Sequence, residues 1–142
     1  MTTEEIALVK NSWKTLREVK PEIIGDVFYT KLFLESPELK PMFSSSMDKQ
    51  AKKLITMLNV IIARLDRLDE LTDDIRKLAV RHDGYGVRPA HYDLVGAALL
   101  WTLKTAMGLD WTDAVEKAWV KCYTTLSGAM ISATNKHSKT LQ

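Results

Sequence analysis

Apolar residues recur every three or four positions along almost the whole chain, which is the spacing of one helix face. The first stripe, for example, consists of Ile6, Val9, Trp13 and Leu16. No stretch sustains the two-residue alternation that marks a half-buried strand. The pattern therefore predicts an all-α protein.

Prolines, glycines and capping residues divide this pattern into about seven helices of unequal length. Thr2 and Glu5 have the spacing of a capping box, and Thr72 and Thr112 are expected to cap two later helices. The predicted helices run from Thr2 to Pro21, over 21–35, 36–43 and about 47–65, from Thr72 to Gly84, from Pro89 to Gly108, and onward from Thr112, with a loop at Ser44–Ser46.

The 142 residues are about the size of one domain, and no repeat or flexible linker divides them. We expect a globular domain over 1–134 and a polar, frayed tail at 135–142. Helices of such unequal length favour a crossed-helix assembly over a simple four-helix bundle, and crossed helices can leave a cavity between them.

The composition gives no sign of a nucleic-acid or membrane partner. There are 20 Lys and Arg against 18 Asp and Glu, and the apolar stretches are far shorter than the roughly 20 residues that span a bilayer. The N-terminus lacks the basic leader and apolar run of a secretory signal. A single cysteine, Cys122, excludes a disulfide within the chain. We therefore expect a cytoplasmic protein.

One histidine, His82, continues an apolar stripe that begins at Leu71 and includes Ile75 and Leu78. By pattern alone this is most often a well-satisfied core histidine. The chain has three histidines and neither an HExxH motif nor paired cysteines, so a metal site built from several protein ligands is not expected. A site with one histidine needs a cofactor that supplies the other ligands, and haem needs only one imidazole and an apolar slot.

Four segments then carry a family resemblance over about 130 residues. They read DVFYTKLF followed by SPELKPMF, DKQAKKLI, RHDGYGVRPAHYDLVG and EKAWVKCY. In this order they resemble the globin family, and within it the bacterial single-domain globins and the haem domains of flavohaemoglobins. The resemblance implies a globin fold of seven to eight crossed helices that enclose a haem b pocket, with His82 as the iron ligand.

The resemblance also places two polar side chains on the opposite, distal side of the haem. It implies that the hydroxyl of Tyr29 donates to bound dioxygen, and that the amide of Gln50 donates to the same ligand or steadies Tyr29. Two plainer alternatives remain: Tyr29 is a core tyrosine bonded to a carbonyl, and Gln50 is a solvated helix residue. His82 is expected to donate its other N–H to an acceptor near Leu78.

Further haem contacts follow from the same alignment, although core packing predicts the same burial for the apolar ones. Those expected to contact haem are Phe43, Leu54, Val87, Val95 and Tyr92. Lys53 is a candidate for a haem propionate, with Arg81 and His91 as weaker ones, while an exposed lysine is the more ordinary interpretation.

Two departures from the flavohaemoglobin pattern shape the functional expectation. Thr134 stands where a glutamate of the last helix is expected to charge the proximal histidine, although Tyr92 keeps the tyrosine of that network. No reductase segment follows residue 142 in this sequence. Both points favour reversible binding of dioxygen over self-sufficient oxygenation.

We therefore expect a dioxygen-binding globin that also takes other diatomic ligands and is not an enzyme by itself. The alternative is a nitric oxide dioxygenase that detoxifies nitric oxide with a separate reductase. Gas sensing is less favoured because no output domain is attached, and a haem-free regulatory module would show no Soret band.

Overall fold

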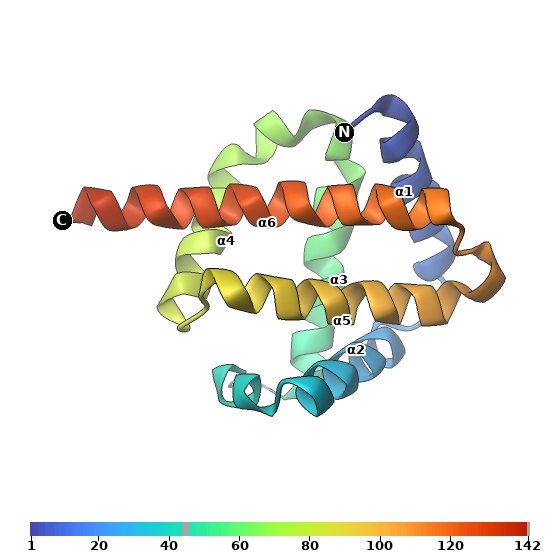
Figure 1. Ribbon diagram of the computed structural model, residues 1–142, viewed down its shortest axis with the longest axis horizontal. Helices are drawn as coiled ribbons and strands as arrows, with labels where there is room; N and C mark the ends of the chain where they lie inside the picture. The colour runs from blue at the N-terminus through green and yellow to red at the C-terminus, as the bar shows by residue number, and fades with distance from the viewer. Residues whose placement is uncertain (44–45, 142) are drawn as a thin grey trace.

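The punctuation residues of the sequence lie at helix boundaries in the computed structural model, which describes residues 1–43 and 46–141 and the side chains up to Asn135. Throughout this described part the regular elements are helical, which confirms the all-α prediction (Figure 1). The elements are α1 (Thr3–Leu16), α2 (Pro21–Glu35), η1 (Pro37–Met42), α3 (Met47–Ala63), η2 (Leu65–Leu71), α4 (Thr72–Gly84), α5 (Pro89–Met107), η3 (Gly108–Asp110) and α6 (Asp113–Leu141).

Capping residues and prolines explain the starts of α1, α2, α5 and α6. The Thr2 hydroxyl accepts from the Glu5 N–H at 3.1 Å, and the Glu5 carboxylate accepts from the Thr2 N–H at 2.7 Å, which is the predicted capping box. Thr112 caps α6 by accepting from the N–H of Val115 at 3.2 Å. Prolines occupy the first turns of α2 and α5, where a missing N–H costs nothing.

Three boundaries differ from prediction. Thr72 is the first residue of α4 rather than its cap, because η2 leads directly into α4 and the Thr72 hydroxyl turns back to donate to the Asp69 carbonyl at 2.8 Å. α3 ends at Ala63, slightly before the predicted end near residue 65, because η2 begins at Leu65. α6 continues as a helix to Leu141, through most of the segment predicted to be a frayed tail. Positions 44 and 45 of the predicted loop lie outside the described residues.

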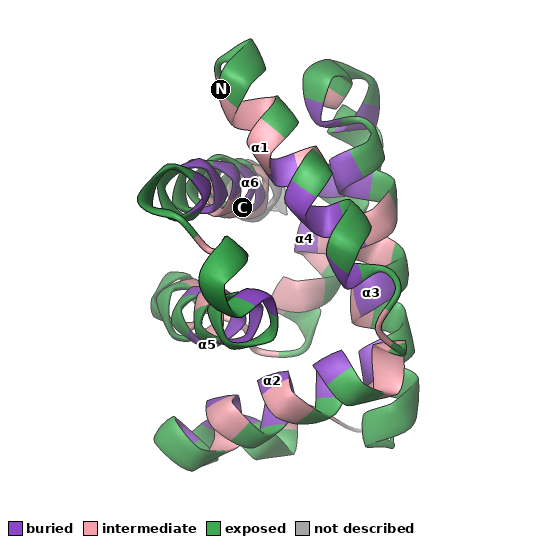
Figure 2. Ribbon diagram, turned by 90° about the vertical axis from the view of Figure 1, so that its right-hand side faces the viewer, coloured by how far each residue is buried: buried purple, intermediate pink, exposed green. Residues whose placement is uncertain are grey.

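The helices cross in pairs around a buried interior. α5 and α6 run side by side, α3 crosses behind them, and α2 passes beneath (Figure 1). α6 packs on α1 over its first half and on α4 over its second half. The purple, buried faces of the helices in Figure 2 point toward this interior. None of the helices in the described ranges is long and apolar enough to cross a membrane.

The buried residues form two clusters. The larger lies between α1, α2, α3, α5 and α6, and includes Trp13, Phe28 and Trp119. The smaller joins α3, η2, α4 and α6. Its members are Ile61, Leu71, Ile75, Ala79, Leu126 and Met130. The helix that carries His82 is therefore anchored by its own apolar stripe.

Candidate functional site

Tyr29 lies in a cage of aromatic rings. Its ring stacks on Phe33 at 5.8 Å between centroids and meets Phe28 and Phe43 edge-on at 4.8 and 5.3 Å. Tyr29 is only 5% exposed. These rings come from α2 and from the end of η1, so the cage fixes the direction of the phenol.

The hydroxyl of Tyr29 donates to the backbone carbonyl of Gln50 at 3.4 Å. This is well beyond the usual 2.7–2.8 Å of an O–H···O bond, so the contact is weak. Burial raises the pKa of Tyr29 to about 12, and the phenol is therefore a neutral donor at physiological pH. The side chain of Gln50 is half-buried and takes part in none of the hydrogen bonds found in the described part of the chain.

A close crossing of α2 and α3 brings these two residues together. A Cβ on Gly25 would collide with the Cβ of Ala51 and would lie 2.9 Å from its Cα. Tyr29 follows Gly25 by one turn, and Gln50 directly precedes Ala51. The absence of a side chain at Gly25 therefore permits the close approach of α2 and α3 that brings Tyr29 near Gln50.

His82 lies on α4 with one nitrogen already paired. Its Nδ1 is 2.8 Å from the carbonyl oxygen of Leu78, one turn earlier, as the sequence predicts. A carbonyl can only accept, so Nδ1 carries the proton and Nε2 presents its lone pair. Burial lowers the pKa of His82, the Leu78 carbonyl opposes this, and the charge of Arg81 adds to the lowering. A neutral imidazole oriented in this way is suited to bind a metal.

The apolar residues expected around the site are inward-facing but incompletely covered. Phe43, Leu54 and Val95 are partly buried and pack against the larger core cluster. Leu78 and Tyr92 border the smaller cluster in the same way. Within the described residues His82 belongs to no group of three metal-binding side chains, so a metal bound here must bring its other ligands with it. One free imidazole nitrogen and partly covered apolar side chains fit haem.

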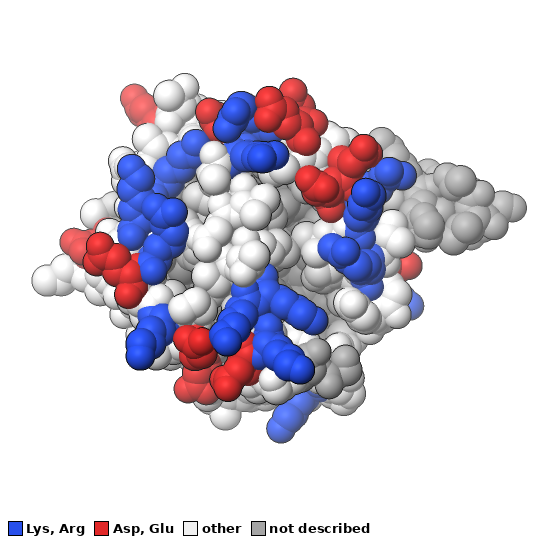
Figure 3. All heavy atoms as spheres, turned by 180° about the vertical axis from the view of Figure 1, so that it is seen from behind, with Lys and Arg blue, Asp and Glu red and all other residues white. Residues whose placement is uncertain are grey.

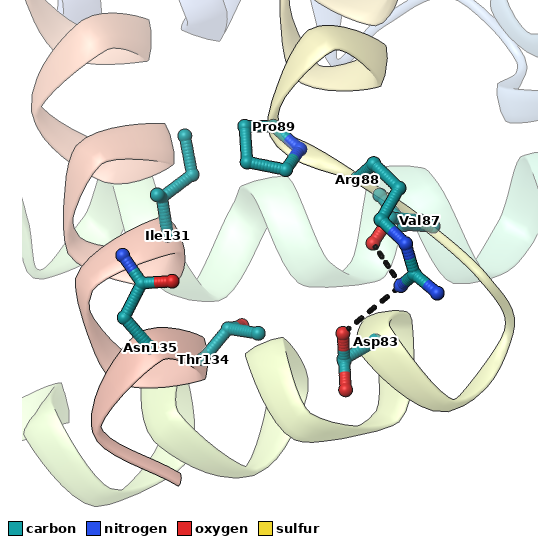
Figure 4. A pocket seen from close by; sticks show the side chains of 7 residues that line it. All are labelled: Asp83, Val87, Arg88, Pro89, Ile131, Thr134 and Asn135. Carbon is teal, nitrogen blue, oxygen red and sulfur yellow. Dashed lines mark hydrogen bonds and ion pairs between the residues drawn. The ribbon is translucent and has the colours of Figure 1, made fainter. Parts of the chain in front are cut away.

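A cavity of about 360 Å³ opens between the end of α4, the following loop and α6 (Figure 4). It is lined by Asp83, Val87, Arg88, Pro89, Ile131, Thr134 and Asn135. Val87 thus borders this cavity, and the Thr134 hydroxyl donates to the Met130 carbonyl at 3.0 Å. Asp83 and Arg88 form an ion pair at 3.2 Å that sequence reasoning missed. The available signal was two opposite charges five residues apart, with Gly84 and Gly86 between them.

Tyr92 is half-buried on α5, and its carbonyl accepts from the Tyr123 hydroxyl at 2.6 Å. The Tyr123 ring lies against Gly96, where an added Cβ would come within 2.5 Å of it. Burial, with a contribution from the charge of Asp83, raises the pKa of Tyr92. Tyr92 is therefore fixed to α6 through its carbonyl and packs against the smaller cluster.

The charged candidates are less well placed. Lys53 and Arg81 are exposed. His91 closes the first turn of α5, because its Nδ1 accepts from the Arg88 N–H at 2.9 Å. A hollow of about 420 Å³ on α4 is lined by Arg76, Lys77, Val80 and Arg81. On the face shown in Figure 3, Lys and Arg alternate with Asp and Glu around a paler centre.

Comparisons with known proteins show the family to which the chain belongs. The family model described as Globin matches residues 26–130, so the chain belongs to the globin family, whose members bind haem. A flavohemoprotein of Vibrio cholerae is 30% identical over 92% of this chain, which spans about a third (34%) of that protein. The fold matches a bacterial globin from Campylobacter jejuni with a TM-score of 0.83, at 29% identity over 97% of this chain and 99% of the other.

A second solved structure is an engineered carbene transferase, described as a candidate nitric oxide dioxygenase, from Rhodothermus marinus. It superposes with a TM-score of 0.88 at 25% identity, covering 99% of this chain and 98% of the other. The globin fold is thus confirmed both by the family match and by these structures.

Proposed function

We propose that this globin holds haem b through Nε2 of His82 and binds dioxygen reversibly, with Tyr29 and Gln50 as hydrogen-bond donors to the ligand. Haem supplies an iron with one free coordination position for a diatomic ligand. The chain supplies the imidazole, the apolar surroundings and the donors. Other diatomic ligands, nitric oxide among them, would use the same position.

The observation that carries this proposal is the state of the Tyr29 hydroxyl. It is buried among aromatic rings, it remains protonated up to a pKa of about 12, and its bond to the Gln50 carbonyl is long at 3.4 Å. A donor held in this way can turn to an incoming ligand at little cost. The half-buried Gln50 amide is a second donor on the same helix crossing.

Replacing Tyr29 with Phe tests this role. A hydrogen bond to a ligand with partial negative charge contributes about 1.5 kcal/mol, so dioxygen should dissociate on the order of tenfold faster. Stopped-flow displacement by carbon monoxide measures the rate. Tyr85→Phe is the matched control, because Tyr85 is 62% exposed and lies beside His82. Equal dissociation rates in Tyr29→Phe and the parent would refute the role of Tyr29.

The second candidate function is nitric oxide dioxygenation, which the likeness to the Rhodothermus protein favours. That reaction converts nitric oxide and dioxygen to nitrate and needs one electron per turnover. The chain spans about a third (34%) of the Vibrio cholerae flavohemoprotein, and we propose that a reductase supplies this electron. Nitric oxide consumption should then continue over many turnovers only when a reductase and its nicotinamide donor are added. If nitric oxide consumption stops after one turnover even with reductase and nicotinamide donor present, dioxygenation is refuted and reversible binding is the function.

A further inference from the structure

The end of α4 carries a charged pair directly beside His82. Asp83 follows His82 in the chain, and its Oδ1 accepts from Nη1 of Arg88 at 3.2 Å. The Asp83 side chain is 34% exposed and that of Arg88 is 63% exposed. The pair is therefore only partly screened by solvent on the aspartate side.

The loop that joins these two residues folds back onto the turn of His82. The N–H groups of Tyr85 and Val87 both donate to the His82 carbonyl at 3.1 Å. The N–H of Gly86 donates to the Asp83 carbonyl at 3.0 Å. Gly86 makes this possible with a φ of +90°, which favours glycine. The loop thus fixes Arg88 relative to the backbone of His82.

Both members of the pair also line the cavity between the end of α4 and α6. In Figure 4 Asp83 lies on one wall, Ile131 and Thr134 of α6 lie on the other, and Arg88 reaches back across the loop to Asp83. Among the described residues that line this cavity, Asp83 is the one carboxylate. The charge of Asp83 extends beyond the pair, since it contributes to the raised pKa of Tyr92.

From this geometry we propose that Asp83 and Arg88 are positioning residues that hold the reduction potential of the haem steady, because each charge offsets the effect of the other on the environment of His82. The negative charge of Asp83 favours the more positive, ferric state of the iron, and Arg88 offsets that charge. With the pair intact the two effects nearly cancel.

A simpler role would be that the pair only fastens the loop. In that case removing either partner would loosen the same loop and move the potential in the same direction. The electrostatic role instead requires shifts of opposite sign. The inference rests on the proposed role of His82 as iron ligand, and a His82→Gly variant tests that role separately.

The experiment is a spectroelectrochemical titration of the haem-loaded protein. Asp83→Asn should raise the potential and Arg88→Gln should lower it, each changing the ferric-to-ferrous ratio at a fixed potential by roughly threefold or more. The double variant should return close to the parent, and Arg88→Lys should retain most of the parent potential. The control is the Asp73–Arg76 pair, which has the same 3.2 Å distance in the first turn of α4. Neutral variants of Asp73 or Arg76 should change the ferric-to-ferrous ratio less than those of Asp83 and Arg88.

Shifts of the same sign in the two single variants, or shifts no larger than those of the control pair, would overturn the inference. If Arg88→Gln fails to fold, Asp83→Asn must still raise the potential by more than Asp73→Asn does, and an unchanged or lower potential in Asp83→Asn would overturn the inference. His82→Gly that keeps an unchanged ferrous spectrum would show instead that the assignment of the iron ligand is wrong. The two failures are therefore distinguishable.

Discussion

Gly25→Ala tests whether the crossing of α2 and α3 sets the geometry around Tyr29. The added methyl group would collide with the Cβ of Ala51 and approach its Cα to 2.9 Å. The obstacle includes backbone of a packed helix, which cannot rotate out of the way. One of the two helices must move.

The magnitude follows from two opposing effects. Alanine in a helix interior is favoured over glycine by about 1 kcal/mol. Overpacking a buried contact costs about 1–3 kcal/mol, and contact with backbone places this case toward the upper end. The free energy of unfolding should therefore fall by about 1–2 kcal/mol. Because Gln50 precedes Ala51, the Tyr29–Gln50 contact, already 3.4 Å, should lengthen as well.

Urea denaturation of the haem-loaded protein measures the loss of unfolding free energy. The dioxygen dissociation rate reports the change at the Tyr29–Gln50 contact. Gly128→Ala is the matched control, since nothing lies within 4 Å of a Cβ at that exposed position in α6. In this control the free energy of unfolding should rise by about 0.5–1 kcal/mol, and the dioxygen dissociation rate should stay unchanged. Ala51→Gly, added to Gly25→Ala, removes the colliding Cβ and should recover part of the loss. Equal stabilisation in Gly25→Ala and Gly128→Ala would refute the argument.

Two further predictions concern the core. Ser12→Ala removes the acceptor of the Trp119 indole N–H, which lies 2.9 Å from the Ser12 Oγ in the buried interior. Because the buried donor is then unpaired, the free energy of unfolding in urea titrations should fall by about 1–3 kcal/mol. A loss no larger than that of the exposed Thr124→Ala variant would contradict this. Burial raises the pKa of Tyr29 to about 12, so between pH 10 and 12 the phenol ionises in the unfolded chain before it does in the folded one. The free energy of unfolding should therefore fall as pH rises through this range, and Tyr29→Phe should make that fall less steep. Identical slopes in the variant and the parent would contradict the prediction.

The helix boundaries were predictable where a residue acts locally. The capping box of Thr2, the cap at Thr112 and the prolines at the starts of α2 and α5 act within one turn of the chain. Thr72 was predicted wrongly because the same residue type serves both as a cap and as a first-turn residue. Which role it takes depends on η2, whose apolar ends Leu65 and Leu71 are buried against the rest of the fold.

Parts of the candidate site were predictable for the same reason. The bond from His82 to the Leu78 carbonyl spans one helical turn, so sequence spacing indicates it. The Asp83–Arg88 pair also bridges a short loop, but its geometry depends on the positive φ of Gly86 and on the direction in which α5 begins. The closeness of Gly25 to Ala51 depends on how two separate helices cross. No local pattern in the sequence carries that information.

The hydrogen bond from Tyr29 to the Gln50 carbonyl affects how the proposed binding of dioxygen can be measured. On that proposal, the Tyr29 hydroxyl must leave the Gln50 carbonyl to reach a ligand, so ligand capture exchanges one hydrogen bond for another. The measured effect of Tyr29→Phe is the difference between the two bonds. Because the bond to Gln50 is long, it subtracts little, and most of the ligand bond should appear in the dissociation rate. A globin with the same two residues but a tighter crossing would hold its tyrosine more firmly to the carbonyl and release dioxygen faster.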